Sequence, residues 1–284
     1  TTLFRSHETY RAGDGRWLAP DEVQVEGDPR RAVEIATGET VEIGPVIKMS
    51  KSKRNVVDPE DIIAQYGADT ARWFMLSDSP PERDVEWTTA GVEGAWRFLQ
   101  RVWRMLEELP EAPAEPPADM GAEALALRKA THKTIAGVTE DIEGFTFNKA
   151  VARIYELANA IGRVKGDGPD AAFARREAVE TLARLMNPVT PHLTEEMWQA
   201  LGHETSLVNT PWPEAIRALA QDDMIVLPVQ VNGKKRAELE VARDADREAI
   251  EAAALATPEV IRHLGENGPK KVIVVPGRIV NVVV

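Results

Sequence analysis

The sequence predicts a multidomain, mainly α-helical protein with a small β-rich segment near its beginning and a small α/β domain at its end. Its 284 residues suffice for about two domains. Apolar residues recur every three or four positions through much of residues 88–201, which is the pattern of amphipathic helices. Both flanks instead alternate apolar and polar residues between turn-forming Gly, Pro and Asn, as short strands do.

The composition excludes several classes of protein. The chain has no cysteine and its five histidines are widely spaced, so we expect neither disulfides nor a zinc site and assign no metal ligands. No apolar run approaches the roughly 20 residues of a membrane helix, so we expect no membrane partner and a cytoplasmic location. A net charge of −12 argues against a generic nucleic-acid coat but permits a local basic surface. The chain begins at Thr1, which suggests a piece of a longer protein.

Residues 1–47 are predicted to form a small β-rich insert. Short stretches that alternate apolar and polar residues are separated by Gly and Pro turns. Trp17 is interpreted as part of the core of this insert, with a substrate-stacking role as the less favoured reading. The predicted strands are residues 23–25 and 31–35, and the predicted turns are residues 13–15, 27–29 and 37–39.

The densest cationic stretch of the chain is residues 48–54, Lys-Met-Ser-Lys-Ser-Lys-Arg, called the signature loop below. It is followed by Asp58, a good helix N-cap, and by Pro59, which suits the first helical position. We therefore expect a mobile loop anchored on a short helix that runs from residue 59 to about residue 66.

Lysines on such a loop can reach polyphosphate as point charges, and serine hydroxyls can add hydrogen bonds. Lys48, Lys51, Ser50 and Ser52 are the candidates in this loop. The alternative is an ordinary solvated surface loop without a ligand.

Several more helices are predicted between residues 68 and 221. In a short helix over residues 68–79, Asp69 serves as the cap and is expected to pair with Arg72. A helix over residues 88–109 is expected to bury Val92, Trp96, Leu99, Trp103 and Leu106. Beyond the Pro-rich connector 110–118, helices over about residues 120–142, after residue 146, over 170–186 and from residue 190 predict an antiparallel bundle.

Two sets of basic residues could contact phosphates. Arg97, Arg101 and Arg104 recur at helical spacing, and pairing with neighbouring glutamates is the equally favoured alternative. In the α/β domain of residues 222–284, Asn232-Gly233 predicts a hairpin. The basic residues around this domain are Lys234, Lys235, Arg236, Lys270, Lys271 and Arg278, for which protection of sheet edges is the alternative role.

The signature loop resembles the KMSKS loop of class I aminoacyl-tRNA synthetases. Its continuation through Asn55, Asp58-Pro59, residues 66–69 and Arg72 follows that family. Over the whole chain, the sequence is similar to the C-terminal part of bacterial-type leucyl-tRNA synthetases. The other strings that carry the resemblance are His7-Glu8-Thr9-Tyr10, Glu86-Trp87, residues 91–103, Phe145-Thr146-Phe147-Asn148, Pro191-His192, Glu195-Glu196 and Trp198.

The resemblance implies four parts. Residues 1–47 correspond to a leucine-specific insert and connector, and residues 48–87 to the KMSKS loop with stem-contact helices. Residues 88–221 correspond to an anticodon-binding-type bundle, and residues 222–284 to a C-terminal tRNA-contact domain.

The resemblance also implies an ATP-dependent leucine–tRNA ligase, expected to be a monomer, with leucine and tRNA(Leu) as partners and with ATP and Mg2+. Lys51 and Lys48 would be the catalytic charges. ATP binding would involve Lys48, Met49, Ser50, Lys51 and Ser52. Binding of tRNA would involve Arg97, Arg101, Arg104, Lys234, Lys235, Arg236, Lys270, Lys271 and Arg278.

One departure limits this expectation. The His-x-Gly-His motif that holds the adenine side of ATP in class I synthetases does not occur in this sequence. We therefore expect the chain alone not to aminoacylate. The alternatives are the same part of an isoleucyl-, valyl- or methionyl-tRNA synthetase, or a non-catalytic helical module that binds tRNA or protein.

Overall fold

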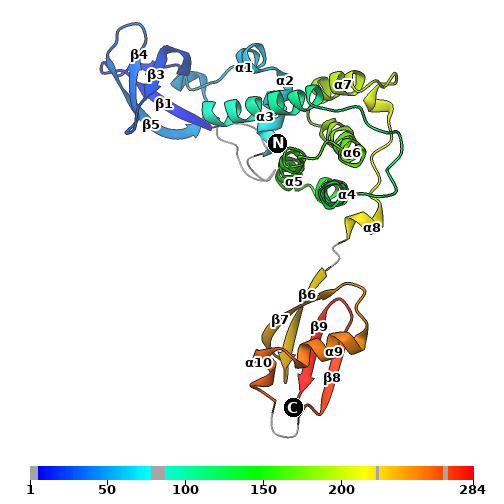
Figure 1. Cartoon of the computed structure of the whole chain (residues 1–284). Coiled ribbons are helices and arrows are strands. Elements are labelled where there is room, and N and C mark those ends of the chain that lie inside the picture. The colour runs from blue at the N-terminus through cyan, green and yellow to red at the C-terminus, as the bar shows by residue number, and fades with distance from the viewer. Residues whose placement is uncertain (1–5, 78–86, 222–223, 265–267) are drawn as a thin grey trace. The chain divides into compact units, whose positions relative to one another are not determined.

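The structure, a computed structural model, describes residues 6–77, 87–221, 224–264 and 268–284 (Figure 1). Two units, Thr1–Ala220 and Gln221–Val284, are each compact and are described separately. The first unit holds a five-stranded sheet and the helical bundle, and the second holds a four-stranded sheet with short helices. This arrangement confirms the predicted fold class, which is mainly helical with a β-rich beginning and a small α/β end.

The β-rich insert is an antiparallel sheet in the order β2-β1-β5-β4-β3. Its strands β3 and β4 confirm the two predicted strands, whereas β5 was not among the predicted ones. Lys48, the last residue of β5, pairs with Ser6 of β1, so the sheet ends where the signature loop begins. The five strands are β1 (Ser6–Arg11), β2 (Trp17–Leu18), β3 (Val23–Glu26), β4 (Arg31–Glu34) and β5 (Thr40–Lys48).

The core of the insert contains Leu18 and not Trp17, so that prediction was wrong. Leu18 is fully buried among Tyr10, Val23 and Val41, whereas Trp17 is half-buried. Successive side chains of a strand point to opposite faces, so only one of the two neighbours can face the core. Trp17 consequently remains accessible to other parts of the chain.

Two short helices follow the signature loop. The Asp58 carboxylate accepts a hydrogen bond from the backbone N–H of Glu60 at 2.9 Å, which caps α1 (Pro59–Tyr66) as predicted. Gly67, with a φ of +85°, ends α1 before α2 (Ala68–Ser77) begins. Trp73 of α2 is fully buried and stacks on Phe98 at 5.2 Å between ring centroids. The α2 helix therefore packs into the core of the bundle.

Among the described residues of the first unit, five bundle helices surround one hydrophobic core, to which α1 and α2 also contribute (Figure 1). Leu127 and Ile135 of the second of these five helices are buried, and so are Ile154 and Leu157 of the third, at the spacing of amphipathic helices. The short α8 (Arg217–Ala220) follows them. The bundle helices are α3 (Thr89–Glu107), α4 (Ala122–Glu143), α5 (Phe147–Ile161), α6 (Pro169–Met186) and α7 (Pro191–Ala200).

The buried face of α3 differs from the predicted one. Val92 and Leu99 are buried as predicted, but Trp96 is 41% exposed and Trp103 and Leu106 are only partly buried. The other buried side chains of the helix are Ala95, Phe98, Val102 and Met105. A Cβ atom on Gly91 would lie only 2.6 Å from the ring of Phe74, so the first turn of α3 lies directly against α2. This close approach places Gly91 and Ala95 on the packed face and turns the bulky Trp96 toward solvent.

The second unit is a four-stranded sheet in the order β7-β6-β9-β8. The Asn232-Gly233 hairpin is confirmed, with positive φ angles of 48° and 79° at its two turn residues. The Asp246 carboxylate accepts the Ala249 N–H at 2.7 Å and caps the helix that begins at Arg247. Its elements are β6 (Met224–Val231), β7 (Lys234–Ala242), α9 (Arg247–Leu255), α10 (Pro258–Ile261), β8 (Lys271–Val275) and β9 (Ile279–Val283).

Candidate functional site

The signature loop leaves the end of β5 and makes one tight 3₁₀ turn, Lys51–Lys53, before α1 begins. Lys48 and Lys51 are exposed, and neither forms an ion pair within the described part of the chain. Met49 is half-buried and packs against the main core of the first unit. The apolar side chain thus fixes one point of the loop while both lysines remain available to an anion.

A buried asparagine fixes the base of the loop. Asn55 has no exposed surface, and its Oδ1 accepts the backbone N–H of Ser50 at 2.9 Å. Its Nδ2 donates to the backbone carbonyls of His7 and Ile47 at 3.2 Å and 3.3 Å. These carbonyls belong to β1 and β5, so one amide side chain joins the loop to the end of the sheet where β1 begins and β5 ends.

The tip of the loop contains two hydroxyls beside the central lysine. The Oγ atoms of Ser50 and Ser52 lie 3.3 Å apart, and Ser52 is exposed like Lys51. Hydroxyls and an ammonium group can together bind phosphate oxygens, with the lysine acting as a compact point charge. The geometry therefore suits an anion with several oxygens.

The last two residues of the loop contact the insert. The Nζ atom of Lys53 lies 5.6 Å from the centroid of the Trp17 ring, and the Arg54 guanidinium donates to the Glu22 carboxylate at 2.8 Å. Arg54 has a φ of +54°, in the left-handed region that non-glycine residues seldom adopt. No signal in the sequence indicated these contacts of Lys53 and Arg54.

Asp69 and Arg72 do not pair with each other, which corrects the prediction. The Asp69 carboxylate accepts the Leu193 N–H at 2.7 Å and contacts Nδ1 of His192 at 2.9 Å. The Arg72 guanidinium donates to the carbonyls of Val189 and Pro188 at 2.7 Å and 2.8 Å. The negative Asp69 thus accepts from a free backbone N–H in the first turn of α7. The positive Arg72 donates to free backbone carbonyls just after α6.

These contacts attach the helices that follow the signature loop to the α6–α7 corner of the bundle. Asp69 also lies inside α2 instead of capping it. The predicted end of that helix at Ser79-Pro80-Pro81, and Glu86 of the quoted motif, lie outside the described residues.

The arginines of α3 have different environments. Arg97 is exposed and lies 3.4 Å from Glu93, which is a weak pair at the surface. Arg101 donates to Oδ1 of Asn159 at 2.8 Å and to the Ala158 carbonyl at 2.9 Å, so part of its hydrogen-bonding capacity joins α3 to α5. Arg104 lines a cavity of about 470 Å³ together with Arg101, Lys165 and Arg175.

The basic residues of the second unit are all exposed, but they form more than one group. Lys234 and Lys271 lie at the same end of the sheet, because Lys234 pairs with Val231, Val231 with Val282, and Val282 with Val272. Lys235, Arg236 and Lys270 are their sequence neighbours. Arg278 lies in the β8–β9 turn at the opposite end of these strands. Lys235 also pairs with Glu238 at 2.7 Å.

His132 and His192 both have hydrogen-bond partners. His132 is buried, its Nδ1 accepts the Ile216 N–H at 3.1 Å, and its Nε2 lies 3.4 Å from Glu177. The His192 ring is 77% exposed and contacts Asp69. Among the described residues, no group of three or more His, Cys, Asp or Glu side chains is arranged to hold a metal ion. None of the described helices combines the length and apolarity needed to cross a membrane.

Two family profiles match the chain. One described as an anticodon-binding domain of tRNA ligase matches residues 125–252, and one described as tRNA synthetases class I (I, L, M and V) matches residues 41–88. The second match includes the signature loop, and the first includes helices of the bundle and part of the second unit.

Curated relatives match nearly the whole chain. It is 55% identical over 285 residues to leucine–tRNA ligase of Parvibaculum lavamentivorans, and 53% identical over 291 residues to that of Agrobacterium fabrum. Each match covers 98% of this chain and 33% of the relative, so the chain spans about a third of the length of these relatives.

A solved structure supports the same relationship. The ternary LeuRS–tRNA–LeuAMS complex of Agrobacterium radiobacter is similar with a TM-score of 0.70 and 32% identity, over 83% of this chain and 31% of that one. Fold, signature loop and sequence identity agree. Over nearly its whole length, the chain is therefore similar to about a third of a leucine–tRNA ligase.

Proposed function

We propose that this chain supplies the KMSKS loop and tRNA-docking parts of a leucine–tRNA ligase. In the complete reaction, a carboxylate oxygen of leucine attacks the α-phosphate of ATP, the bond to the β-phosphate breaks, and pyrophosphate leaves. The leucyl group then passes from the adenylate to the terminal ribose of tRNA(Leu). The observation that carries the proposal is an exposed Lys51, without an ion pair among the described residues, on a loop whose base is fixed by the buried Asn55.

Lys51 is proposed to neutralise the negative charge that develops on the leaving phosphates. A charge that is already in position when the bond breaks stabilises the transition state without a reorganisation cost. Lys48 enters the loop from the end of β5 and would contribute a second charge. The hydroxyls of Ser50 and Ser52 would add hydrogen bonds to phosphate oxygens, while Met49 anchors the loop to the core.

Magnesium is expected to accompany the phosphates of ATP. The described residues offer no cluster of carboxylates that would form a protein-made site for it, so no step is assigned to it in this chain. The ATP-binding segment with the His-x-Gly-His motif would come from outside this chain, since the sequence lacks it. A monomeric enzyme in the cytoplasm is the expected state of the whole protein.

The tRNA is proposed to contact two basic surfaces. One is the exposed face of α3 with Arg97 and Arg104, and the other is the end of the second sheet that carries Lys234 and Lys271. Arg101 would contribute only its remaining donors, because Asn159 and Ala158 already use two. Such contacts neutralise phosphates and give binding that weakens with salt.

The experiment that tests this function is amino-acid-dependent exchange of pyrophosphate into ATP by a full-length ligase that carries this chain. Leucine should support exchange far better than isoleucine, valine or methionine. A preference for one of those three would replace leucine with that amino acid in the proposal. Exchange with none of the four, by a folded protein that still binds tRNA, would favour a non-catalytic tRNA-binding module.

A further inference from the structure

We propose that the β-rich insert holds the signature loop in position through two side-chain contacts, called the insert latch. They are Trp17 with Lys53 and Glu22 with Arg54. Trp17 and Glu22 are thus positioning residues, which act on the loop without touching the phosphates. Only the catalytic consequence of the latch rests on the proposed function, since the contacts themselves can be measured in the chain alone.

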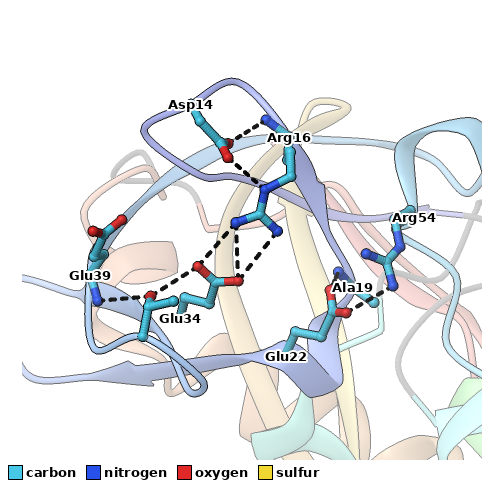
Figure 2. A network of polar contacts seen from close by, with 8 residues as sticks. Asp14, Arg16, Ala19, Glu22, Glu34, Glu39 and Arg54 are labelled. Carbon is cyan, nitrogen blue, oxygen red and sulfur yellow. Dashed lines mark hydrogen bonds and ion pairs between the residues drawn. The ribbon is translucent and has the colours of Figure 1, made fainter.

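The Glu22 carboxylate is held in place by the backbone of the insert, independently of its contact with the loop. Glu22 ends a 3₁₀ turn, Pro20–Glu22, and its Oε2 accepts the backbone N–H of Ala19 at 2.8 Å. Its Oε1 accepts a hydrogen bond from the Arg54 guanidinium at 2.8 Å (Figure 2). The hydrogen bond from Ala19 also lowers the pKa of Glu22, which favours the charged form that Arg54 requires.

Trp17 provides the second contact. It lies in β2 at the edge of the insert sheet, and Lys53 approaches its ring at 5.6 Å from the centroid. Arg11 of the adjacent β1 approaches the same ring at 5.4 Å. A tryptophan ring attracts cations within about 6 Å of its centroid. Because Leu18 fills the core in its place, the ring of Trp17 is accessible to the loop.

The backbone of the loop explains why outside contacts matter. Its turn is closed by two long hydrogen bonds, from Lys53 N to Ser50 O at 3.2 Å and from Arg54 N to Lys51 O at 3.3 Å. Arg54 also adopts a left-handed conformation, which costs free energy for a residue with a Cβ atom. Such a conformation persists only when surrounding contacts determine it. The latch contacts the two residues where this support is needed.

Asn55 and the insert latch fix different halves of the signature loop. Asn55 fixes its base through Ser50, and the latch fixes its second half through Lys53 and Arg54. Lys51 lies between these fixed points with its side chain exposed. Each latch contact is weak at an exposed site, so each should change loop opening by only about two- to fivefold. Loss of both should change it by about tenfold.

The test is hydrogen exchange of the Lys53 and Arg54 amides in the 284-residue chain. Glu22→Gln keeps an oxygen for the Ala19 N–H but removes the charge that pairs with Arg54. Trp17→Leu removes the aromatic ring, and Trp17→Phe keeps a weaker one. We expect Glu22→Gln and Trp17→Leu each to speed exchange about two- to fivefold, with a smaller effect of Trp17→Phe.

Glu39→Gln is the matched control, because Glu39 is an exposed carboxylate of the same insert. It should leave loop exchange unchanged. The amides of Val25 and Val33, in the β3–β4 ladder, report whether the insert itself remains folded. If Glu22→Gln speeds their exchange as much as that of the loop, loosening of the insert explains the effect and the latch is wrong.

A double-mutant cycle separates the latch from the capping role of Glu22. In an Arg54→Ala background, Glu22→Gln should produce no further change in loop exchange. The same effect of Glu22→Gln in both backgrounds, or unchanged loop exchange in Glu22→Gln and Trp17→Leu, would overturn the proposal.

The catalytic consequence is measured in a full-length ligase. Loosening the loop should lower kcat for leucine activation by about the factor seen in exchange, and should leave transfer from preformed adenylate unchanged. Faster loop exchange with unchanged activation would retain the latch but reject Trp17 and Glu22 as positioning residues. Absence of activation in the unsubstituted ligase would count against the proposed function and not against the latch.

Discussion

The buried Asn55 makes the anchoring of the signature loop quantitatively testable. Replacing it with alanine removes three hydrogen bonds and leaves the Ser50 N–H and the His7 and Ile47 carbonyls without their partner. Each lost bond costs about 1 kcal/mol, and the half-buried groups can regain some water. We therefore expect Asn55→Ala to lower the free energy of unfolding of the first unit by about 2–3 kcal/mol.

Tryptophan fluorescence measures this unit selectively. All seven tryptophans of the chain lie between residues 17 and 212, so none belongs to the second unit. Urea unfolding followed at this signal should give a lower midpoint with an unchanged slope. The melting temperature should fall by about 5–10 °C for a unit of this size.

Two further variants serve as a control and a comparison for Asn55→Ala. Asn209→Ala removes an exposed asparagine of the same unit and should change stability by less than about 0.5 kcal/mol. Asn55→Asp keeps an acceptor for the Ser50 N–H but places a carboxylate oxygen beside two carbonyls, so it should destabilise at least as much as Asn55→Ala. If Asn55→Ala is no more damaging than Asn209→Ala, the side chain does not anchor the loop, and the reasoning fails.

Three other results are expected. Burial alone would raise the pKa of Glu177, but hydrogen bonds from His132 and Arg128 outweigh it and lower that pKa. The resulting stabilisation is present above about pH 4.3 and is lost as pH falls through the folded pKa, so Glu177→Gln should unfold with a weaker pH dependence in this acid range. With roughly three phosphate contacts, the chain should bind tRNA at least tenfold more weakly at 200 mM than at 50 mM salt, and removal of residues 222–284 should weaken binding further. Filter binding that does not change with salt would contradict this expectation. The purified chain alone should show no leucine-dependent pyrophosphate exchange, and measurable exchange would contradict the need for an additional adenine-binding segment.

Local signals in the sequence predicted many of the elements. Asp58-Pro59 located the start of α1, and Asn232-Gly233 located the β6–β7 hairpin, because each dipeptide satisfies a local backbone requirement. The stripes of α4 and α5 were also predictable, since their buried positions follow helical spacing. The signature loop itself was predictable from its charge density.

Contacts between distant residues were not predictable in this way. The α3 sequence has apolar side chains on more than one face, and only the close packing of Gly91 on Phe74 decides that Trp96 is exposed. Asp69 and Arg72 have the spacing of an intrahelical pair, but their actual partners lie more than 100 residues away. Asn55 carries no local sign that its amide joins two strand ends to the loop.

The most direct test of the central claim compares the two half-reactions of a full-length ligase with Lys51→Ala. If the Lys51 charge stabilises departing pyrophosphate, kcat for leucyl-adenylate formation should fall about a hundredfold, with a much smaller rise in KM for ATP. Lys51→Arg should rescue this step only in part, because a planar guanidinium does not replace a compact ammonium. Transfer from preformed leucyl-adenylate to tRNA should remain nearly unchanged, since no pyrophosphate leaves in that step. Equal losses in both half-reactions would instead mean that Lys51 maintains the loop structure, and the proposed role of its charge would be wrong.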